Sequence, residues 1–255
     1  MSWVVLALAL GAGPSEWVLP GVRVHVVASE DLDPDRLRAL ARPEVVLWIR
    51  TRSNGLRRST VETLHDAGAA FVQVRPPLGA PSLAPFSGRV GPWVEERGLD
   101  ASRVGRWSPG RLAVDLEGPL TEELAARIGK LRPAAVVWRR GGWPGPDEWV
   151  RARALSGVEL VADAAGDCGS VPRRARVRVR LPLGRRQEHV CGLPVRLEVP
   201  ATVDLDQIRE VFLTRADVDL LTDVGDDPAL AGAARRWIEA LAAATPTGAA
   251  KARAP

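Results

Sequence analysis

The sequence contains no Tyr and only two Lys, Lys130 and Lys251, so Arg carries nearly all of its positive charge. The formal net charge is +4, but the Arg residues are interleaved with acids and form no single basic stripe, which argues against a nucleic-acid partner. The sequence also lacks a phosphate-binding loop, a dinucleotide fingerprint, a G-x-S-x-G motif and a Cys/His cluster with zinc-site spacing. We therefore expect no cofactor and no metal site.

The apolar run from Trp3 to Ala12 is too short to span a bilayer, so we expect no membrane span. The run ends in small residues, as in the cleavage region of a secretory leader, although no basic residues precede it. We expect residues 1–13 to be such a leader, which would place the protein in the periplasm or outside the cell. The alternative is a hydrophobic first strand in a cytoplasmic protein.

Cysteine is scarce: Cys168 and Cys191 are the only two. A disulfide between them would close a loop of about 24 residues and stabilise the fold by about 3 kcal/mol, on the chain-entropy account. Such a bond persists only in an oxidising compartment, and in a cytoplasmic protein both residues would be buried thiols. The sequence leaves both possibilities open.

Strand-like and helical patterns alternate along most of the chain. The expected strands are residues 22–29, 45–50, 71–75, 111–117, 135–140, 158–163, 176–181, 195–199 and 218–223. Helix N-caps are predicted at Asp33, Thr121, Asp204 and Asp227. Strands that alternate with helices are joined by crossovers and run parallel.

Nearly every expected strand has one apolar and one polar face; Leu116, for example, lies between Asp115 and Glu117. Parallel strands with helices on both faces would instead be apolar throughout. Helices can therefore cover one side only, and such a sheet is best closed into a (β/α)8 barrel with a polar lumen. We predict a single, irregular TIM-barrel-like domain over residues 20–245, with an inserted β hairpin near 170–192 and a disordered tail at 246–255.

In such barrels, functional side chains lie at the C-terminal ends of the strands. The residues expected at this mouth are His25, Ser29, Arg50, Arg52, Arg75, Asp115, Glu117, Arg139, Arg140, Asp163, Glu198 and Asp223. Asp115 and Glu117 would then face a lumen, where charges can meet partners and water. Their alternative role is a structural ion-pair network with Arg50, Arg75 and Arg139, because buried charges must be paired.

Assigning the segment at 176–181 to the inserted hairpin leaves eight of the nine expected strands for the barrel. Glu117 ends the fourth of these eight, and Glu198 ends the seventh. This arrangement resembles that of retaining glycosidases built on (β/α)8 barrels, and it implies Glu117 as acid/base and Glu198 as nucleophile. The family usually has Asn before the fourth-strand Glu, where Leu116 stands here. The residues expected to contact a small-molecule or glycan ligand, neutral or anionic, are Asp115, Arg50, Arg75, Arg139 and Asp163. Trp143, with Trp93 and Trp107 in other expected loops, could stack on sugar faces.

The segment "VDLLTDVGDDP" near the C-terminus is similar to the end of glycerophosphodiester phosphodiesterases, which implies metal-dependent phosphodiester chemistry. Those enzymes carry a His-Arg-Gly motif after the first strand, whereas this stretch reads "VHVVASE" and offers only His25. A third possibility is a non-catalytic binding module or a degenerate barrel enzyme. The sequence alone does not decide whether the protein is an enzyme, and it gives no oligomeric state.

Overall fold

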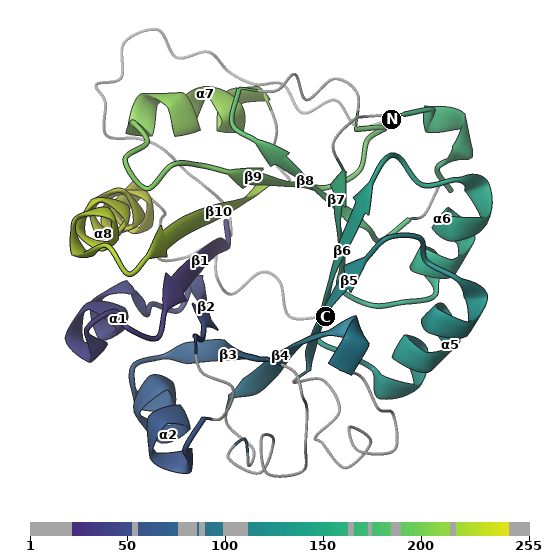
Figure 1. Cartoon of the computed structure of the whole chain (residues 1–255). Helices are drawn as coiled ribbons and strands as arrows, with labels where there is room; N and C mark the ends of the chain where they lie inside the picture. The colour runs from purple at the N-terminus through teal and green to yellow at the C-terminus, as the bar shows by residue number, and fades with distance from the viewer. Residues whose placement is uncertain are drawn as a thin grey trace, which may run out of the picture.

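The computed structural model describes residues 22–52, 56–75, 86, 90–98, 112–162, 166–172, 175–184, 190–214 and 218–244. Within these residues, ten parallel strands form a closed barrel (Figure 1). The strands are β1 (Val24–Ser29), β2 (Val45–Arg50), β3 (Ala69–Val74), β4 (Gly91–Glu95), β5 (Ala113–Glu117), β6 (Ala135–Gly141), β7 (Val158–Ala162), β8 (Arg178–Pro182), β9 (Val195–Glu198) and β10 (Val218–Gly225). The helices are α1 (Pro34–Leu40), α2 (Arg58–Asp66), α5 (Glu122–Leu131), α6 (Pro146–Arg153), α7 (Leu205–Thr214) and α8 (Pro228–Ala244), with the 3-10 turns η1 (Glu96–Gly98) and η2 (Cys168–Ser170).

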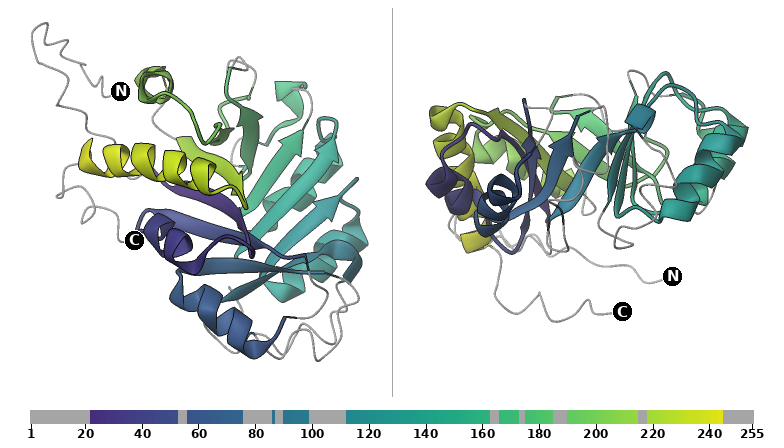
Figure 2. Two further views of the ribbon diagram at one scale, coloured as in Figure 1. Left: turned by 60° about the vertical axis from the view of Figure 1, so that its left-hand side comes forward. Right: turned by 60° about the horizontal axis from the view of Figure 1, so that its bottom comes forward.

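Hydrogen bonding closes the barrel where its first and last strands meet. β1 pairs in parallel with β2 on one side and with β10 on the other, so that Val24 lies opposite both Val45 and Leu220. Every other strand pairs with its neighbours in sequence. Figure 2 shows the helices outside the ring of strands. The predicted α/β barrel is therefore confirmed, and each of the nine expected strand segments overlaps a strand of the structure.

The hairpin expected near residues 170–192 is wrong. β8 lies in this segment and pairs in parallel with both β7 and β9, as a strand of the barrel wall. Its side chains alternate as the wall requires: Val179 and Leu181 are buried on the outer side, while Arg178 and Arg180 face the lumen. We expected a hairpin because no helix pattern flanks this segment, but the strand pattern alone was sufficient.

A strand absent from the sequence prediction, β4, also belongs to the barrel and brings the total to ten. β4 begins with Gly91 and Pro92, a pair that ordinarily indicates a turn. Trp93, which was expected in a loop, lies in this strand and is buried in the lumen. Trp107 lies outside the described residues.

The predicted helix starts follow from local hydrogen bonding. The Asp33 carboxylate accepts from the amides of the first turn of α1, and the Thr121 hydroxyl accepts from the amide of Leu124 in α5. Asp227 caps α8 through the amide of Ala229 at 2.7 Å, and Asp204 bonds the amide of Asp206 at the start of α7. Each cap satisfies donors that the first helical turn leaves free.

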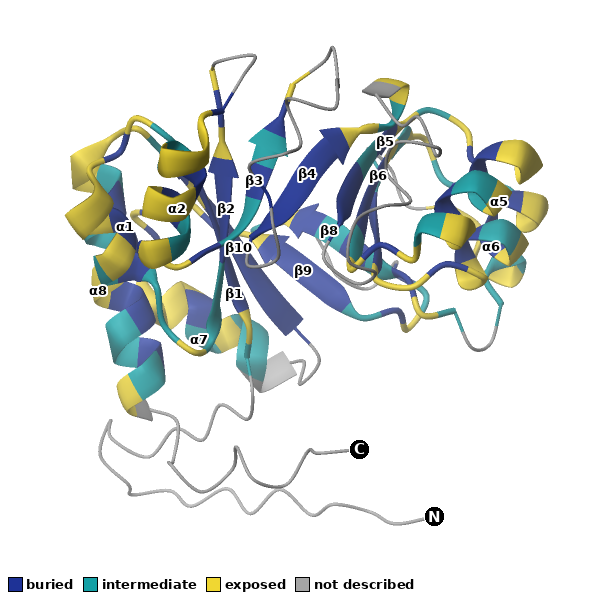
Figure 3. Cartoon of the chain, turned by 90° about the horizontal axis from the view of Figure 1, so that it is seen from below, coloured by how far each residue is buried: buried dark blue, intermediate teal, exposed yellow. Residues whose placement is uncertain are grey.

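The expected leader at residues 1–13 and the expected tail at 246–255 lie outside the described residues. Among the residues that are described, no helix is long and apolar enough to cross a membrane. The main apolar core lies between the outer side of the strands and the helices, and Figure 3 shows buried strands beside helices whose outer faces are exposed. The inner side of the strands therefore forms a separate environment.

Candidate functional site at the barrel mouth

One half of the lumen is filled by aromatic and aliphatic side chains. Trp48 of β2 stacks on Phe71 of β3 with ring centroids 4.4 Å apart, and it meets Trp93 of β4 edge-on at 5.4 Å. Val27 of β1 and Leu221 of β10 belong to the same cluster. We call this group the aromatic half of the lumen. Its packing needs no charged partner.

The other half of the lumen holds buried charges. Glu159 of β7 lies between two guanidinium groups: Oε1 is 2.5 Å from Nε of Arg180 on β8, and Oε2 bonds Nη1 of Arg196 on β9. Asp219 of β10 pairs with Arg178 and lies 3.7 Å from Nη2 of Arg196. Only 4% of Glu159 and 7% of Arg196 and Asp219 is exposed. Buried ions of this kind are tolerated only when paired, and we call these five residues the charged half of the lumen.

His25 of β1 lies where the two halves meet. Trp48 Nε1 donates to its Nδ1 at 3.1 Å, and Nη2 of Arg196 lies 2.8 Å from its Nε2. Burial, followed by the positive charge of Arg196, lowers the pKa of His25 from 6.5 to about 2. The ring is therefore neutral at neutral pH. His25 was expected at the mouth, but it lies inside the lumen.

A pocket of about 480 Å³ opens at the C-terminal ends of the strands, and we call it the mouth pocket. The residues that line it are Val27, Arg50, Arg180, Pro182, Leu183, Glu198, Val199, Pro200, Leu221 and Asp223. They come from β1, β2 and β8–β10 or from the residues that follow β8 and β9. This is the end of a parallel barrel at which sites form.

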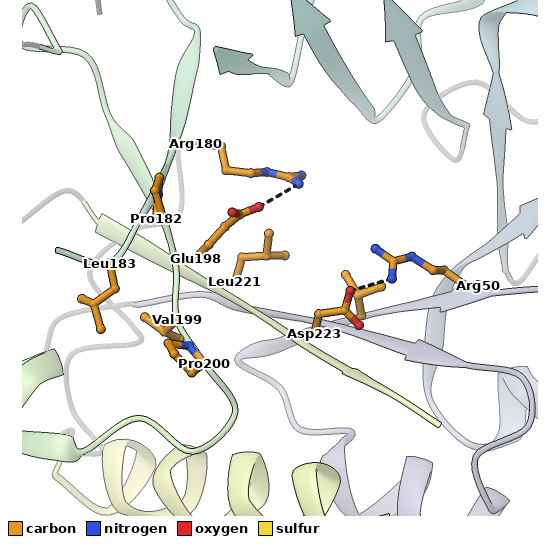
Figure 4. Close-up of a pocket in the computed structure, with 10 residues that line it drawn as sticks. Arg50, Arg180, Pro182, Leu183, Glu198, Val199, Pro200, Leu221 and Asp223 are labelled. Carbon is orange, nitrogen blue, oxygen red and sulfur yellow. Dashed lines mark hydrogen bonds and ion pairs between the residues drawn. The ribbon is translucent and has the colours of Figure 1, made fainter. Parts of the chain in front are cut away.

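Two ion pairs supply the polar groups of the mouth pocket (Figure 4). Arg180 Nη1 lies 3.3 Å from Glu198 Oε1, and Arg50 Nη1 lies 2.6 Å from Asp223 Oδ2. In Figure 4 the apolar side chain of Leu221 lies between the two pairs. Arg180 joins the pocket to the lumen, because the same guanidinium also bonds the buried Glu159. The pocket thus offers two carboxylates, two guanidiniums and apolar walls.

Of the predicted catalytic pair, Glu198 lines the mouth pocket and Glu117 does not. The Glu117 side chain is 77% exposed, and its Oε2 lies 3.3 Å from Nη2 of Arg97 just past β4. Glu117 therefore does not share the mouth pocket with Glu198. Arg50, a predicted binding residue, does line the pocket beside Glu198.

Two other predicted binding residues form an ion pair on neighbouring strands. The guanidinium of Arg139 on β6 donates to both oxygens of Asp115 on β5, at 3.0 and 3.3 Å. Burial raises the pKa of Asp115, although Arg139 opposes this effect. The predicted ion-pair network therefore forms in part, while Arg50 pairs with Asp223 instead. Arg75 is exposed just past the end of β3.

Trp143 acts as an anchor for the loop after β6. Its Nε1 donates to the backbone oxygen of Asp167 at 3.3 Å, and its ring packs edge-on against Trp149 with centroids 5.3 Å apart. These contacts fit a loop anchor, and the stacking of Trp143 on a sugar stays a prediction. Asp163, the remaining predicted binding residue, lies outside the described residues.

Two charged residues of the mouth pocket were given no binding or catalytic role from the sequence. Arg180 was attributed to the mistaken hairpin, although its alternation with Val179 and Leu181 was the signal for a lumen-facing position. Asp223 was placed at the mouth, but its pairing with Arg50 across β1 depends on which strands close the barrel. That neighbour relation cannot be obtained from sequence periodicity.

Among the described residues, no group of three or more His, Cys, Asp or Glu side chains is placed to hold a metal ion. No protein-family model matches the chain, and no curated protein matches its sequence. What the protein can do is therefore inferred from the geometry of the mouth pocket.

Proposed function

We propose that the protein binds a carbohydrate in the mouth pocket. The observation that supports this best is the pairing of Glu198 with Arg180 and of Asp223 with Arg50 beside apolar walls in one pocket. Sugar hydroxyls both donate and accept hydrogen bonds, so they match carboxylate acceptors and guanidinium donors. The C–H faces of a sugar ring match the apolar surface that Leu221 and Pro182 supply.

The two ion pairs of the mouth pocket are exposed enough for a ligand to replace one of their contacts. Asp223 and Glu198 have side chains that are 45% and 46% exposed, so water already competes for their oxygens. Ion pairs in such surroundings contribute little stability, and a ligand hydroxyl can replace one contact at low cost. Binding is therefore the better supported part of the proposal. Cleavage by Glu117 and Glu198 stays a prediction with less support, because an acid carboxyl needs a more enclosed, apolar setting than that of Glu117.

We also propose that the protein is exported. Cys168 and Cys191 form a disulfide, with Cα atoms 5.2 Å apart. Disulfides persist in the periplasm or outside the cell and are rare in the cytoplasm. This bond supports the expectation drawn from the N-terminal apolar run, and cell fractionation of the full chain tests it.

The test of the carbohydrate proposal is a glycan-array screen of the full chain, followed by calorimetry with any sugar that binds. Glu198→Gln and Asp223→Asn should each weaken that binding tenfold or more, since each removes a charged acceptor. The matched control is Glu62→Gln, which removes a carboxylate paired with Arg58 on the surface of α2. Aryl glycosides assayed with the same proteins distinguish cleavage from binding. A folded protein that binds no glycan at millimolar concentration would refute the proposal.

A further inference from the structure

The disulfide between Cys168 and Cys191 brackets a single strand of the barrel. Cys168 lies in η2, after β7, and Cys191 lies shortly before β9. The two cysteines are 23 positions apart in the sequence, and the segment between them includes the whole of β8. The bond therefore links the two ends of the segment that carries this strand.

In the described residues, no α-helix follows β7 or β8, and the same is true of β3 and β4 on the other side of the barrel. β1, β2, β5 and β6 are each followed by an α-helix, and Figure 1 shows these helices against the outside of the barrel. Between Ala162 and Leu205, the described residues contain only η2 and no α-helix. In a regular barrel, packing of a following helix helps to hold each strand in place. Here the covalent bond acts where that packing is reduced.

β8 forms one wall of the mouth pocket. Arg180, Pro182 and Leu183, all within the disulfide loop, line the pocket together with Glu198 of β9. Backbone bonds hold this wall: the Leu183 amide donates to the Glu198 oxygen at 2.8 Å. Displacement of β8 would remove Arg180 both from Glu198 and from the buried Glu159.

We propose that this disulfide is a thiol-exchange site whose reduction releases β8 and opens the wall of the mouth pocket; its effect on ligand binding rests on the proposed carbohydrate function. Cys168 is exposed and Cys191 is half-buried, so we expect an external thiolate to attack at Cys168. Attack by a dithiol reductant breaks the S–S bond, joins the reductant to Cys168 and releases Cys191 as a thiolate that takes up a proton. The second thiol of the reductant then displaces the Cys168 sulfur, so two electrons reduce the protein and the dithiol becomes a disulfide.

Hydrogen exchange tests this without a ligand. In the full chain treated with dithiothreitol, the amides of Val179 and Leu183, which donate to the backbone oxygens of Pro194 and Glu198, should exchange at least tenfold faster. Amides of β1 and β2 should not change. Unchanged exchange in β8 after both cysteines are shown to be reduced would overturn the proposal, and so would an equal increase in every strand.

Arginine labelling with phenylglyoxal reports on the pocket wall in the same samples. The Arg180 side chain is 13% exposed and should become labelled only after reduction, whereas the half-exposed Arg50 should be labelled in both states. Continued protection of Arg180 in the reduced protein would refute the release of the wall. The double variant Cys168→Ser/Cys191→Ser should show the reduced pattern with or without dithiothreitol. If that variant does not fold, exchange and labelling of the wild type with and without dithiothreitol still test the proposal.

If the glycan array identifies a sugar, its affinity for the oxidised and the reduced protein can be compared by calorimetry. We expect reduction to lower that affinity about tenfold. Exchange and labelling need no sugar, so absence of glycan binding to the oxidised protein refutes the carbohydrate function alone. Local release of β8 with unchanged sugar affinity refutes its effect on binding.

Discussion

The two halves of the lumen fill the same barrel in opposite ways. In the aromatic half, Trp48, Phe71 and Trp93 occupy the space between β2, β3 and β4 with stacked and edge-on rings. In the charged half, Glu159 and Arg196 occupy the space between β7 and β9 with ion pairs. The lumen widens as strands are added to a barrel, so ten strands need large side chains, and both Trp and Arg are long enough. The difference lies in what each half needs in order to remain folded.

The aromatic half gains from dispersion and burial and has no charge to satisfy. The charged half depends on every partner, and Nε of both Arg178 and Arg196 is buried without a hydrogen-bond partner in the described part of the chain. Buried polar atoms of this kind are costly. The mouth pocket adjoins the charged half through Arg180. We infer that the charged half is more sensitive than the aromatic half to the loss of a single partner.

The largest predicted effect comes from emptying the centre of the charged half. Glu159→Ala leaves Arg180 and Arg196 buried without their shared carboxylate, and we expect the free energy of unfolding to fall by about 3–5 kcal/mol. Urea denaturation of both proteins measures the loss. Glu239→Ala, which removes a carboxylate from surface pairs with Arg42 and Arg235, is the control and should change stability far less. A loss below about 1 kcal/mol for Glu159→Ala would show that the lumen is wet.

The boundary between the halves predicts a pH dependence. His25 has a pKa of about 2 in the folded protein and about 6.5 when unfolded, so between these values the unfolded state binds one more proton. Stability therefore falls as pH falls below about 6.5, by at most about 1.4 kcal/mol per pH unit from this group. Between pH 6 and pH 4 the wild type should lose about 2.5 kcal/mol more than His25→Gln, measured by urea unfolding. Parallel curves for the two proteins would contradict the assignment.

The sequence was sufficient to predict the barrel but not its number of strands. The alternation of Val and Arg in residues 176–181 describes β8 correctly, yet the missing helices led to its exclusion. Gly91 and Pro92 concealed β4 because the pair also suits a turn. Glu198 and Arg50 could be placed at the mouth because each ends a strand. Which charges meet across the barrel depends on register and strand number, and a pattern within one strand contains neither.

A smaller effect is expected in the aromatic half. Trp48→Phe keeps an aromatic ring against Phe71 but removes the Nε1 donor that bonds Nδ1 of His25. We expect a loss of about 1–2 kcal/mol, since one buried acceptor loses its partner and part of the ring volume is lost. Urea unfolding measures this. The His25→Gln background supplies the check: if the bond to His25 carries the effect, Trp48→Phe should have a smaller effect there.

The smallest effect is predicted at the rim, where Arg50 and Asp223 form a pair with both side chains nearly half exposed. A double-mutant cycle with Arg50→Gln and Asp223→Asn should give a coupling of about 0.5 kcal/mol or less in unfolding, because water screens the charges. The same cycle on Glu159→Gln and Arg180→Gln, in the charged half, should give a coupling several times larger, since both groups are withdrawn from water. Equal coupling in the two cycles would mean that the lumen and the rim are equally solvated. Under the proposed function, this contrast would let a ligand replace the rim contacts while the buried charges keep β8 in place.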